Sequence, residues 1–402
     1  MTPSELRTTM TVVRAFRRAR AAGDHNTEGQ TWAPTKTCWL WAALVFPSLY
    51  IVNKYLGWEG ALAYAVAAAA GVALAPRVTQ PRTDRAAAWG AVATLFLVAL
   101  AFVMLYPRVN VQTPGLGSDD DDAYNVGARA LATGHSPYEQ TTYLGNALHQ
   151  LPGAFVVALP FVLAGTSALQ NLVWLPLFFL AVKAETGNGR AALRLAWLVL
   201  ALAPTVLHQV VTGTGHAANT IYVLLGVWWL VRTRHLGLAA AAWGIGLASR
   251  PNFFFLLPLA FGWIRQARGL GAAFRATALT CATSAALTLP YYLHDPSHFG
   301  PLDAADRVLR FNTVVPYGGE LIVALMGALA IGLSFTRMNT GALFRNCALV
   351  QAFPVAAGAV LGVWQSGRVD LAYVAYSTFA SWFALMAWAG EQHQEGADRR
   401  CQ

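Results

Sequence analysis

The chain has 402 residues, of which 56% are hydrophobic and 12% are charged, and its formal net charge is +9. The charged share is about half that of an average soluble domain. This composition excludes a soluble globular protein, which needs more polar surface to cover its core. The basic residues lie in short segments between apolar blocks, which is typical of membrane topology rather than of nucleic-acid binding. We therefore expect no nucleic-acid partner.

The first 35 residues are polar and basic. They carry five arginines, and no apolar stretch follows these directly: Arg7, Arg14, Arg17, Arg18 and Arg20. A signal peptide requires such a stretch. Residues 1–35 are therefore expected to form a basic cytoplasmic tail, part of it an amphipathic helix on anionic lipid.

Twelve apolar blocks follow. Their lengths are close to what a helix needs to cross about 30 Å of hydrocarbon, and the period-2 alternation of an outer-membrane barrel is absent. The sequence predicts an all-α, polytopic integral membrane protein, with one transmembrane domain over 36–391 and a cytoplasmic tail over 392–402. The predicted crossings are 39–55, 59–75, 87–106, 168–184, 193–211, 217–232, 236–249, 251–264, 272–291, 320–336, 344–363 and 370–389.

The longest polar stretch, 107–150, precedes an apolar piece, Leu151–Gly165, that contains Pro152 and Pro160. This piece is short for a regular crossing, and its prolines interrupt a helix. If it crossed, every later basic loop would face outward, against the positive-inside rule. We therefore expect 107–150 to be an exterior loop, 151–165 to be an interfacial or re-entrant helix, and both termini to be cytoplasmic.

Four consecutive aspartates, Asp119–Asp122, lie just after the third predicted crossing. The first two are placed to begin a short helix over 123–132, where the helix dipole stabilises anions. Ser118 or Asp119 is expected to cap this helix, and Gly134 to end it. Two interpretations remain open: an acidic start to a solvated loop helix, or a general base or metal site at the membrane surface.

The residues around the acidic run follow a recognisable order. An Asp is followed by a Tyr, by an Ala-Arg helix, by Gly-His-Ser-Pro-Tyr at 134–138 and by an apolar piece that opens on Pro152. This order resembles the first exterior loop of the GT-C superfamily, whose members are membrane glycosyltransferases that use polyprenyl-phosphate sugars. The resemblance covers about 107–260 in detail. It implies a GT-C-like fold, a catalytic Asp in this loop, and interfacial helices before the next crossing.

The spacing in that family places the catalytic Asp four residues before the Tyr and nine before the Arg. The resemblance therefore implies that Asp120 is the catalytic base, matched to Tyr124 and Arg129. Asp119 and Asp122 are three residues apart, share a helix face, and remain the alternative. Sugar transfer needs a base that takes the proton of the acceptor hydroxyl as an oxocarbenium-like centre develops. Like-charged neighbours raise the pKa of one carboxylate, which suits this role.

Arg250 lies between two short predicted crossings, in Ser249-Arg250-Pro251-Asn252 at their exterior junction. A charge at this depth is costly unless it is paired. We expect Arg250 to lie within reach of the 119–122 carboxylates or to bind a lipid phosphate. The alternative is an arginine that snorkels to the interface.

Four further residues are candidates for substrate binding: Tyr138, His149, Gln150 and His216. Tyr138 suits stacking on a sugar, and equally an interfacial aromatic belt. His149 and Gln150 precede the interfacial helix and lie either against substrate or in water. His216 shares a helix face with Asn219, a pattern also typical of helix–helix hydrogen bonding.

The resemblance implies a transferase that moves a sugar from a polyprenyl-phosphate donor to a lipid or cell-envelope glycan at the outer face of the cytoplasmic membrane. Its partners would be membrane lipids, that donor, and a glycan or glycolipid acceptor. No cofactor is expected, and no His, Cys or Asp spacing indicates a metal. A lipid or solute transporter and a non-catalytic scaffold are the alternatives. A transporter favours inverted repeats with ionisable residues at the midplane, and the sequence has no convincing repeat.

Overall fold

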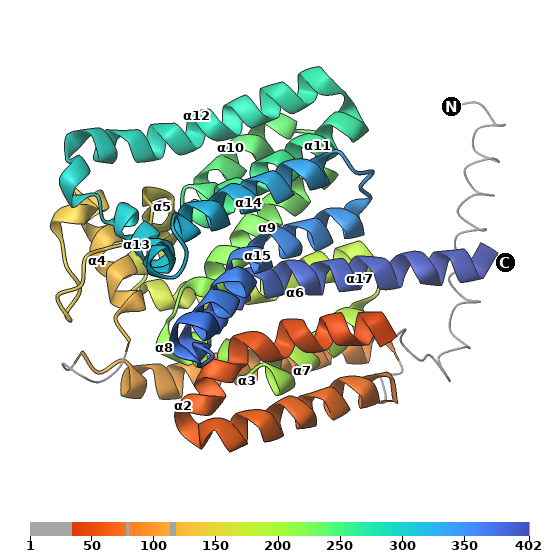
Figure 1. Cartoon of the computed structure of the whole chain (residues 1–402). Helices are drawn as coiled ribbons and strands as arrows, with labels where there is room; N and C mark the ends of the chain where they lie inside the picture. Colours follow the sequence, from red (N-terminus) through yellow and green to blue (C-terminus); the bar gives the residue numbers. More distant parts are fainter. Residues whose placement is uncertain (1–33, 78–80, 82, 113–117, 402) are drawn as a thin grey trace.

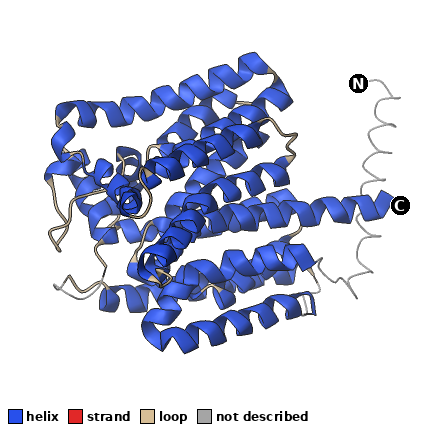
Figure 2. Ribbon diagram, in the orientation of Figure 1, coloured by secondary structure: helices blue, strands red, loops and turns tan. Residues whose placement is uncertain are grey.

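The computed structural model describes residues 34–77, 81, 83–112 and 118–401. Within these ranges every regular element is a helix (Figure 2), and β pairing is limited to one isolated bridge between Thr141 and Ala147. The predicted all-α class is confirmed. The predicted basic tail, 1–35, lies outside the described residues except for its last two.

The first described helix, α2 (Pro34–Leu74), folds back on itself at Gly57, whose φ of 71° is left-handed and suits glycine. Trp41 Nε1 donates to the Ala65 carbonyl oxygen over 3.0 Å, so the two arms run side by side. These arms correspond to the predicted blocks 39–55 and 59–75. The hairpin is followed by α3 (Asp84–Val109), which lies at the edge of the bundle (Figure 1).

Two short helices, α4 (Asp120–Ala132) and α5 (Pro152–Leu163), follow α3. Their shared core includes Tyr124 and Phe155. The Phe155 ring packs directly against Gly127, because a Cβ at this position would lie 2.4 Å from the ring. The later helices are α6 (Gln170–Thr186), α7 (Gly189–Leu202), α8 (Pro204–Thr212), α9 (His216–Arg232), α10 (Leu236–Leu247), α11 (Leu257–Arg268), α12 (Leu270–His294), α13 (Asp303–Leu309), α14 (Gly318–Ser334), α15 (Thr340–Ser366), α16 (Leu371–Val374) and α17 (Thr378–Cys401).

Each predicted apolar block falls on these helices, but not every block is one straight helix. The block 193–211 bends by 81° between α7 and α8, because Pro204 has no N–H with which to continue the helical ladder. By length and composition, five helices of the described part are suited to crossing a membrane, or up to seven if each strongly bent pair counts once. The chain is thus a helical membrane protein with several candidate spans.

The last helix, α17, lies at the centre of the bundle (Figure 1), where Trp382, Phe383 and Met386 are at most 2% exposed. It continues without a break to Cys401. Up to residue 401, the predicted cytoplasmic tail over 392–402 is the continuation of this helix.

Polar contacts gather the basic loops at one end of the molecule. Arg190 at the start of α7 pairs with Asp84 at the start of α3 over 3.3 Å. Arg345 of α15 pairs with Glu391 of α17 over 3.4 Å. Arg268 at the end of α11 donates to carbonyl oxygens at the end of α9. This end also holds the C-terminus (Figure 1).

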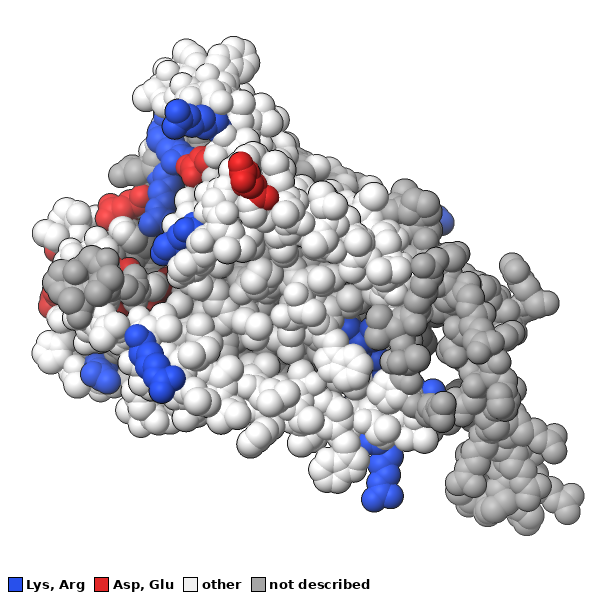
Figure 3. All heavy atoms as spheres, turned by 90° about the horizontal axis from the view of Figure 1, so that it is seen from below, with Lys and Arg blue, Asp and Glu red and all other residues white. Residues whose placement is uncertain are grey.

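The opposite end gathers α4, α5 and the loops on either side of α13 (Figure 1). His149 Nδ1 lies 3.1 Å from the Gly300 carbonyl oxygen, and Arg310 pairs with Asp370 over 3.2 Å. On the face drawn in Figure 3, charged atoms concentrate towards the two ends, and a band without them lies between. The successive helices therefore run back and forth between two polar ends.

Candidate active site

Helix α4 begins within the acidic run, at Asp120, three residues earlier than the predicted start at Ala123. Asp119 occupies the capping position but its side chain makes no capping hydrogen bond. Ser118 Oγ instead accepts from the Asp120 backbone N–H over 3.4 Å. Gly134 has a φ of 77° just beyond the end of α4, as expected for a terminating glycine.

Asp119 and Asp122 point to the same side of α4 and hold the loop over 141–147. Asp119 Oδ2 accepts from the Thr142 hydroxyl (2.8 Å) and from Asn146 Nδ2 (2.7 Å). Asp122 Oδ2 accepts from the Tyr143 backbone N–H (2.8 Å). The expected shared face of these two aspartates is confirmed, but the face is directed at the loop and not at Arg250.

Asp121 is buried, with 0% of its surface exposed. The Tyr106 hydroxyl and Asn110 Nδ2 each donate to its Oδ2 over 2.7 Å. No hydrogen bond reaches Oδ1 from the described residues. Burial raises the pKa of Asp121 to about 6, the Tyr106 hydroxyl opposes the rise, and the charge of Asp120 adds to it. The carboxylate with a raised pKa is thus enclosed within the protein, out of reach of a substrate.

The buried Asp121 predicts a dependence of stability on pH. Because its pKa is about 6 in the folded chain and 3.8 without perturbation, the folded state binds its proton more tightly. Its contribution is fully present below about pH 4 and is lost as the pH rises through 6, a change of about 3 kcal/mol. We expect the Tm of Asp121→Asn, relative to wild type, to rise between about pH 4 and 7 in thermal unfolding. A difference in Tm that does not change with pH would contradict this.

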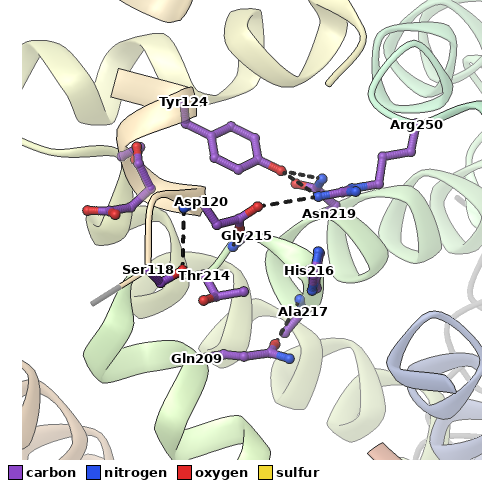
Figure 4. Close-up of polar contacts among 12 residues, drawn as sticks. Ser118, Asp120, Tyr124, Gln209, Thr214, Gly215, His216, Ala217, Asn219 and Arg250 are labelled. Carbon is purple, nitrogen blue, oxygen red and sulfur yellow. Dashed lines mark hydrogen bonds and ion pairs between the residues drawn. The ribbon is translucent and has the colours of Figure 1, made fainter. Parts of the chain in front are cut away.

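Asp120 points away from its neighbours, toward the start of α9 and the junction before η4 (Pro251–Leu256). Its Oδ2 accepts from the Gly215 backbone N–H over 2.6 Å, and its Oδ1 lies 3.8 Å from Nη2 of Arg250 (Figure 4). The Asp120 side chain is 19% exposed and that of Arg250 is 15% exposed, so both are reached from the surface. The expected proximity of Arg250 to the acidic run is therefore observed.

The segment Thr212-Gly213-Thr214-Gly215 presses against α4, and its glycines allow this approach. Gly213 has a φ of 74°, and a Cβ there would lie 2.9 Å from that of Asp121. A Cβ at Gly215 would lie 2.6 Å from the Tyr124 ring. Gly215 directly precedes α9, so the Asp120 carboxylate binds at a helix N-terminus, where the dipole favours an anion. No pattern in the sequence connected this segment with the acidic run.

Arg250 is held in place by its backbone and by its side chain. The backbone of the preceding residue pairs with the segment before α5, since the Leu151 N–H donates to the Ser249 carbonyl oxygen over 3.0 Å. Gly153 of α5 lies against the end of α10, so close that a Cβ at Gly153 would be 2.2 Å from the Ile245 carbonyl oxygen. The Arg250 side chain donates through Nη2 to the Tyr124 hydroxyl over 3.3 Å (Figure 4).

His216 begins α9 beside Asp120 and lies among aromatic rings. Its ring centroid is 5.7 Å from that of Tyr376 and 5.4 Å from that of Phe379. The guanidinium of Arg250 stacks over the Phe379 ring at 5.4 Å, and Arg307 donates to the Tyr376 hydroxyl. Two arginines and a histidine thus surround this aromatic pair. Arg307, Tyr376 and Phe379 come from distant parts of the chain, and the sequence did not identify them as site residues.

The other predicted site residues do not join Asp120. Arg129 lies nine residues after Asp120, on the opposite face of α4, and is exposed. The Tyr138 hydroxyl donates to the Gln150 carbonyl oxygen over 2.9 Å, and its ring packs against Phe299. His149 contacts the Gly300 carbonyl oxygen. Tyr138 and His149 thus stabilise the loop between α4 and α5.

Gln150 differs from these residues. It is 5% exposed, and its Oε1 has no hydrogen-bond partner among the described residues. The next residue, Leu151, donates its backbone N–H to the carbonyl oxygen of Ser249, the residue before Arg250. The expected contact of Gln150 with substrate stays a prediction.

In the described part of the chain, no three His, Cys, Asp or Glu side chains are grouped to hold a metal ion. The groups around the Asp120 carboxylate are the Gly215 backbone N–H, which donates a hydrogen bond to it, and the positively charged guanidinium of Arg250. Comparison of the chain with family models, with curated proteins and with solved structures found no match.

Proposed function

We propose that the chain is a GT-C-like glycosyltransferase that uses a polyprenyl-phosphate sugar. One observation carries this proposal: a carboxylate and a guanidinium, Asp120 and Arg250, face each other at one polar end of a helical membrane bundle. Such a pair supplies both charges that the transfer requires. The carboxylate accepts a proton from the acceptor, and the guanidinium stabilises the departing phosphate.

The contacts of Asp120 suit a base. Its Oδ2 already accepts a hydrogen bond from the Gly215 N–H. The distance of 3.8 Å between Oδ1 and Arg250 Nη2 is longer than a hydrogen bond, so Oδ1 is open to an acceptor hydroxyl. In the proposed step the acceptor oxygen forms a bond to the sugar's anomeric carbon and gives its proton to Asp120. The bond from that carbon to the phosphate oxygen breaks, and polyprenyl phosphate leaves with the electron pair. Arg250 then stabilises the phosphate.

We further propose that twelve segments cross the cytoplasmic membrane, with both termini inside and the Asp120 end outside. The basic loops gather at the opposite end, which the positive-inside rule assigns to the cytoplasm. The 12-residue helix α5 is too short for a crossing of about 30 Å and is the interfacial helix. Exposed aromatic side chains mark both proposed interfaces: Tyr55, Trp58, Tyr317 and Trp364 outside, and Trp39, Trp89, Phe274 and Phe335 inside.

This topology predicts which cysteines a membrane-impermeant maleimide labels in intact cells. In a background without the native cysteines, Thr133→Cys after α4 is expected to react, because both the loop and this side chain are exposed. Arg234→Cys between α9 and α10, also exposed, is expected to react only after permeabilisation. Labelling of Arg234→Cys in intact cells, or protection of Thr133→Cys, would contradict the proposed orientation.

The activity is tested by reconstituting the whole chain in liposomes with labelled polyprenyl-phosphate sugars and cell-envelope acceptor lipids. We expect label to move to the acceptor, with release of polyprenyl phosphate. Labelled lipid that crosses the bilayer intact would instead identify a flippase. The two outcomes are separated by extracting and analysing the labelled lipids.

A further inference from the structure

Asn219 is a fully buried polar residue at the centre of the site. It lies one turn into α9, is 0% exposed, and points at Tyr124 and Arg250 (Figure 4). Its Oδ1 accepts from the Tyr124 hydroxyl (2.7 Å) and from Arg250 Nε (3.0 Å). Its Nδ2 donates to the Gly215 carbonyl oxygen (3.1 Å) and to the Tyr222 hydroxyl (3.0 Å).

This amide orientation is assigned from the network, because it pairs every donor with an acceptor. In the opposite orientation Nδ2 would face the N–H of Arg250 Nε, and Oδ1 would face the Gly215 carbonyl oxygen. The assignment also suits Tyr124, whose hydroxyl then donates to Asn219 and accepts from Arg250 Nη2. The four hydrogen bonds use the full capacity of one primary amide.

Asn219 holds both groups that face the Asp120 carboxylate. It fixes the guanidinium of Arg250 through Nε, so that Nη2 is directed toward Tyr124 and Asp120. It also fixes the carbonyl of Gly215, the residue whose own N–H donates to Asp120 Oδ2. One side chain on α9 thereby sets the positions of the cation and of the amide on either side of the proposed base.

We propose that Asn219 is a positioning residue that presets the geometry of Arg250 and Gly215 around Asp120. This inference rests on the proposed function for its kinetic consequence, but not for the restraint on Arg250. Burial makes the role demanding, because an unpaired polar group there is costly and its neighbours would move to find new partners. Leucine matches the size of asparagine without the polar atoms. Aspartate keeps the acceptor for Arg250 and loses the two donated bonds.

The restraint on Arg250 is measured without reference to sugar transfer. The purified chain is treated with phenylglyoxal, and modification of Arg250 is followed by peptide mass spectrometry in wild type, Asn219→Leu and Asn219→Asp. We expect Asn219→Leu to accelerate modification roughly tenfold, the effect of losing one hydrogen bond to a charged group. Asn219→Asp is expected to react as slowly as wild type, because it still accepts from Arg250 Nε.

The control is Thr280→Val, which removes another buried hydrogen bond, from Thr280 Oγ1 to the Ala240 carbonyl oxygen, far from the site. It is expected to lower the Tm as Asn219→Leu does, while Arg250 reacts as in wild type. In transfer assays Asn219→Leu is expected to lower kcat roughly 10- to 100-fold with little change in the KM of the donor.

The outcomes are distinct. An Arg250 that reacts equally fast in wild type and in Asn219→Leu overturns the positioning role. A purely structural role for Asn219 predicts that Asn219→Leu and Thr280→Val have equal transfer kinetics. Equal kinetics would therefore also overturn the positioning role. Faster modification of Arg250 in Asn219→Leu, with no sugar transfer by the wild type, supports the positioning by Asn219 and contradicts the proposed function.

Discussion

Replacing Asp120 with asparagine is expected to lower sugar transfer roughly 10²- to 10⁴-fold, the span associated with loss of a general base. The amide keeps an oxygen that accepts from the Gly215 N–H, so the local fold should be preserved. What the variant loses is the ability to take the proton of the acceptor hydroxyl. The measurement is the initial rate of label transfer in liposomes, at saturating donor.

The neighbouring aspartates provide matched controls for this variant. Asp119→Asn and Asp122→Asn each alter a carboxylate that holds the loop over 141–147. Both variants are expected to lose less than about tenfold in rate, because an asparagine oxygen still accepts those hydrogen bonds. Equal losses in all three variants would show that the acidic run acts as a structural unit and not through Asp120.

Replacing Arg250 with glutamine is expected to lower transfer roughly 10²- to 10³-fold, the usual effect of removing a preorganised group that stabilises a developing anion. The guanidinium is held by Tyr124 and Asn219 and stacks on Phe379, contacts that a planar fork makes together. Lysine is a point charge without that fork. Arg250→Lys is therefore expected to restore little of the activity.

The control for Arg250 is Arg310, another arginine at the same end of the molecule. It pairs with Asp370 and stacks between the rings of Phe311 and Tyr373, apart from the Asp120 contacts. Arg310→Gln is expected to change transfer by less than about tenfold, because exposed ion pairs contribute little. Wild-type activity in Arg250→Lys would indicate that charge alone suffices, contrary to the role given to the fork.

The sequence predicted those features that depend on local order. Hydropathy located the apolar blocks, because a buried or lipid-facing helix is apolar over its own length. The face shared by Asp119 and Asp122 followed from helical periodicity. The choice of Asp120 among the four aspartates came from a resemblance, and the structure places this residue beside Arg250. The same periodicity, applied from the true start of α4, would have removed Arg129 from the site.

The rest depends on contacts between distant segments. Nothing local joins Gly215 to Asp120, 95 residues away, although a Gly-rich turn before a helix is a typical anion site. Asn219 shares a helix face with His216, but this pattern alone did not reveal the four hydrogen bonds that the Asn219 side chain makes. Arg307 and Tyr376 meet across 69 residues. Such pairs follow from the packing of whole helices, which composition and spacing do not specify.

The most direct measurement is the structure of the whole chain in lipid nanodiscs with added polyprenyl phosphate. We expect the phosphate to contact the guanidinium of Arg250 beside the open Oδ1 of Asp120, with its lipid chain leaving toward the bilayer. A phosphate bound at another place, with the Asp120–Arg250 pair unchanged, would contradict a glycosyltransferase site here.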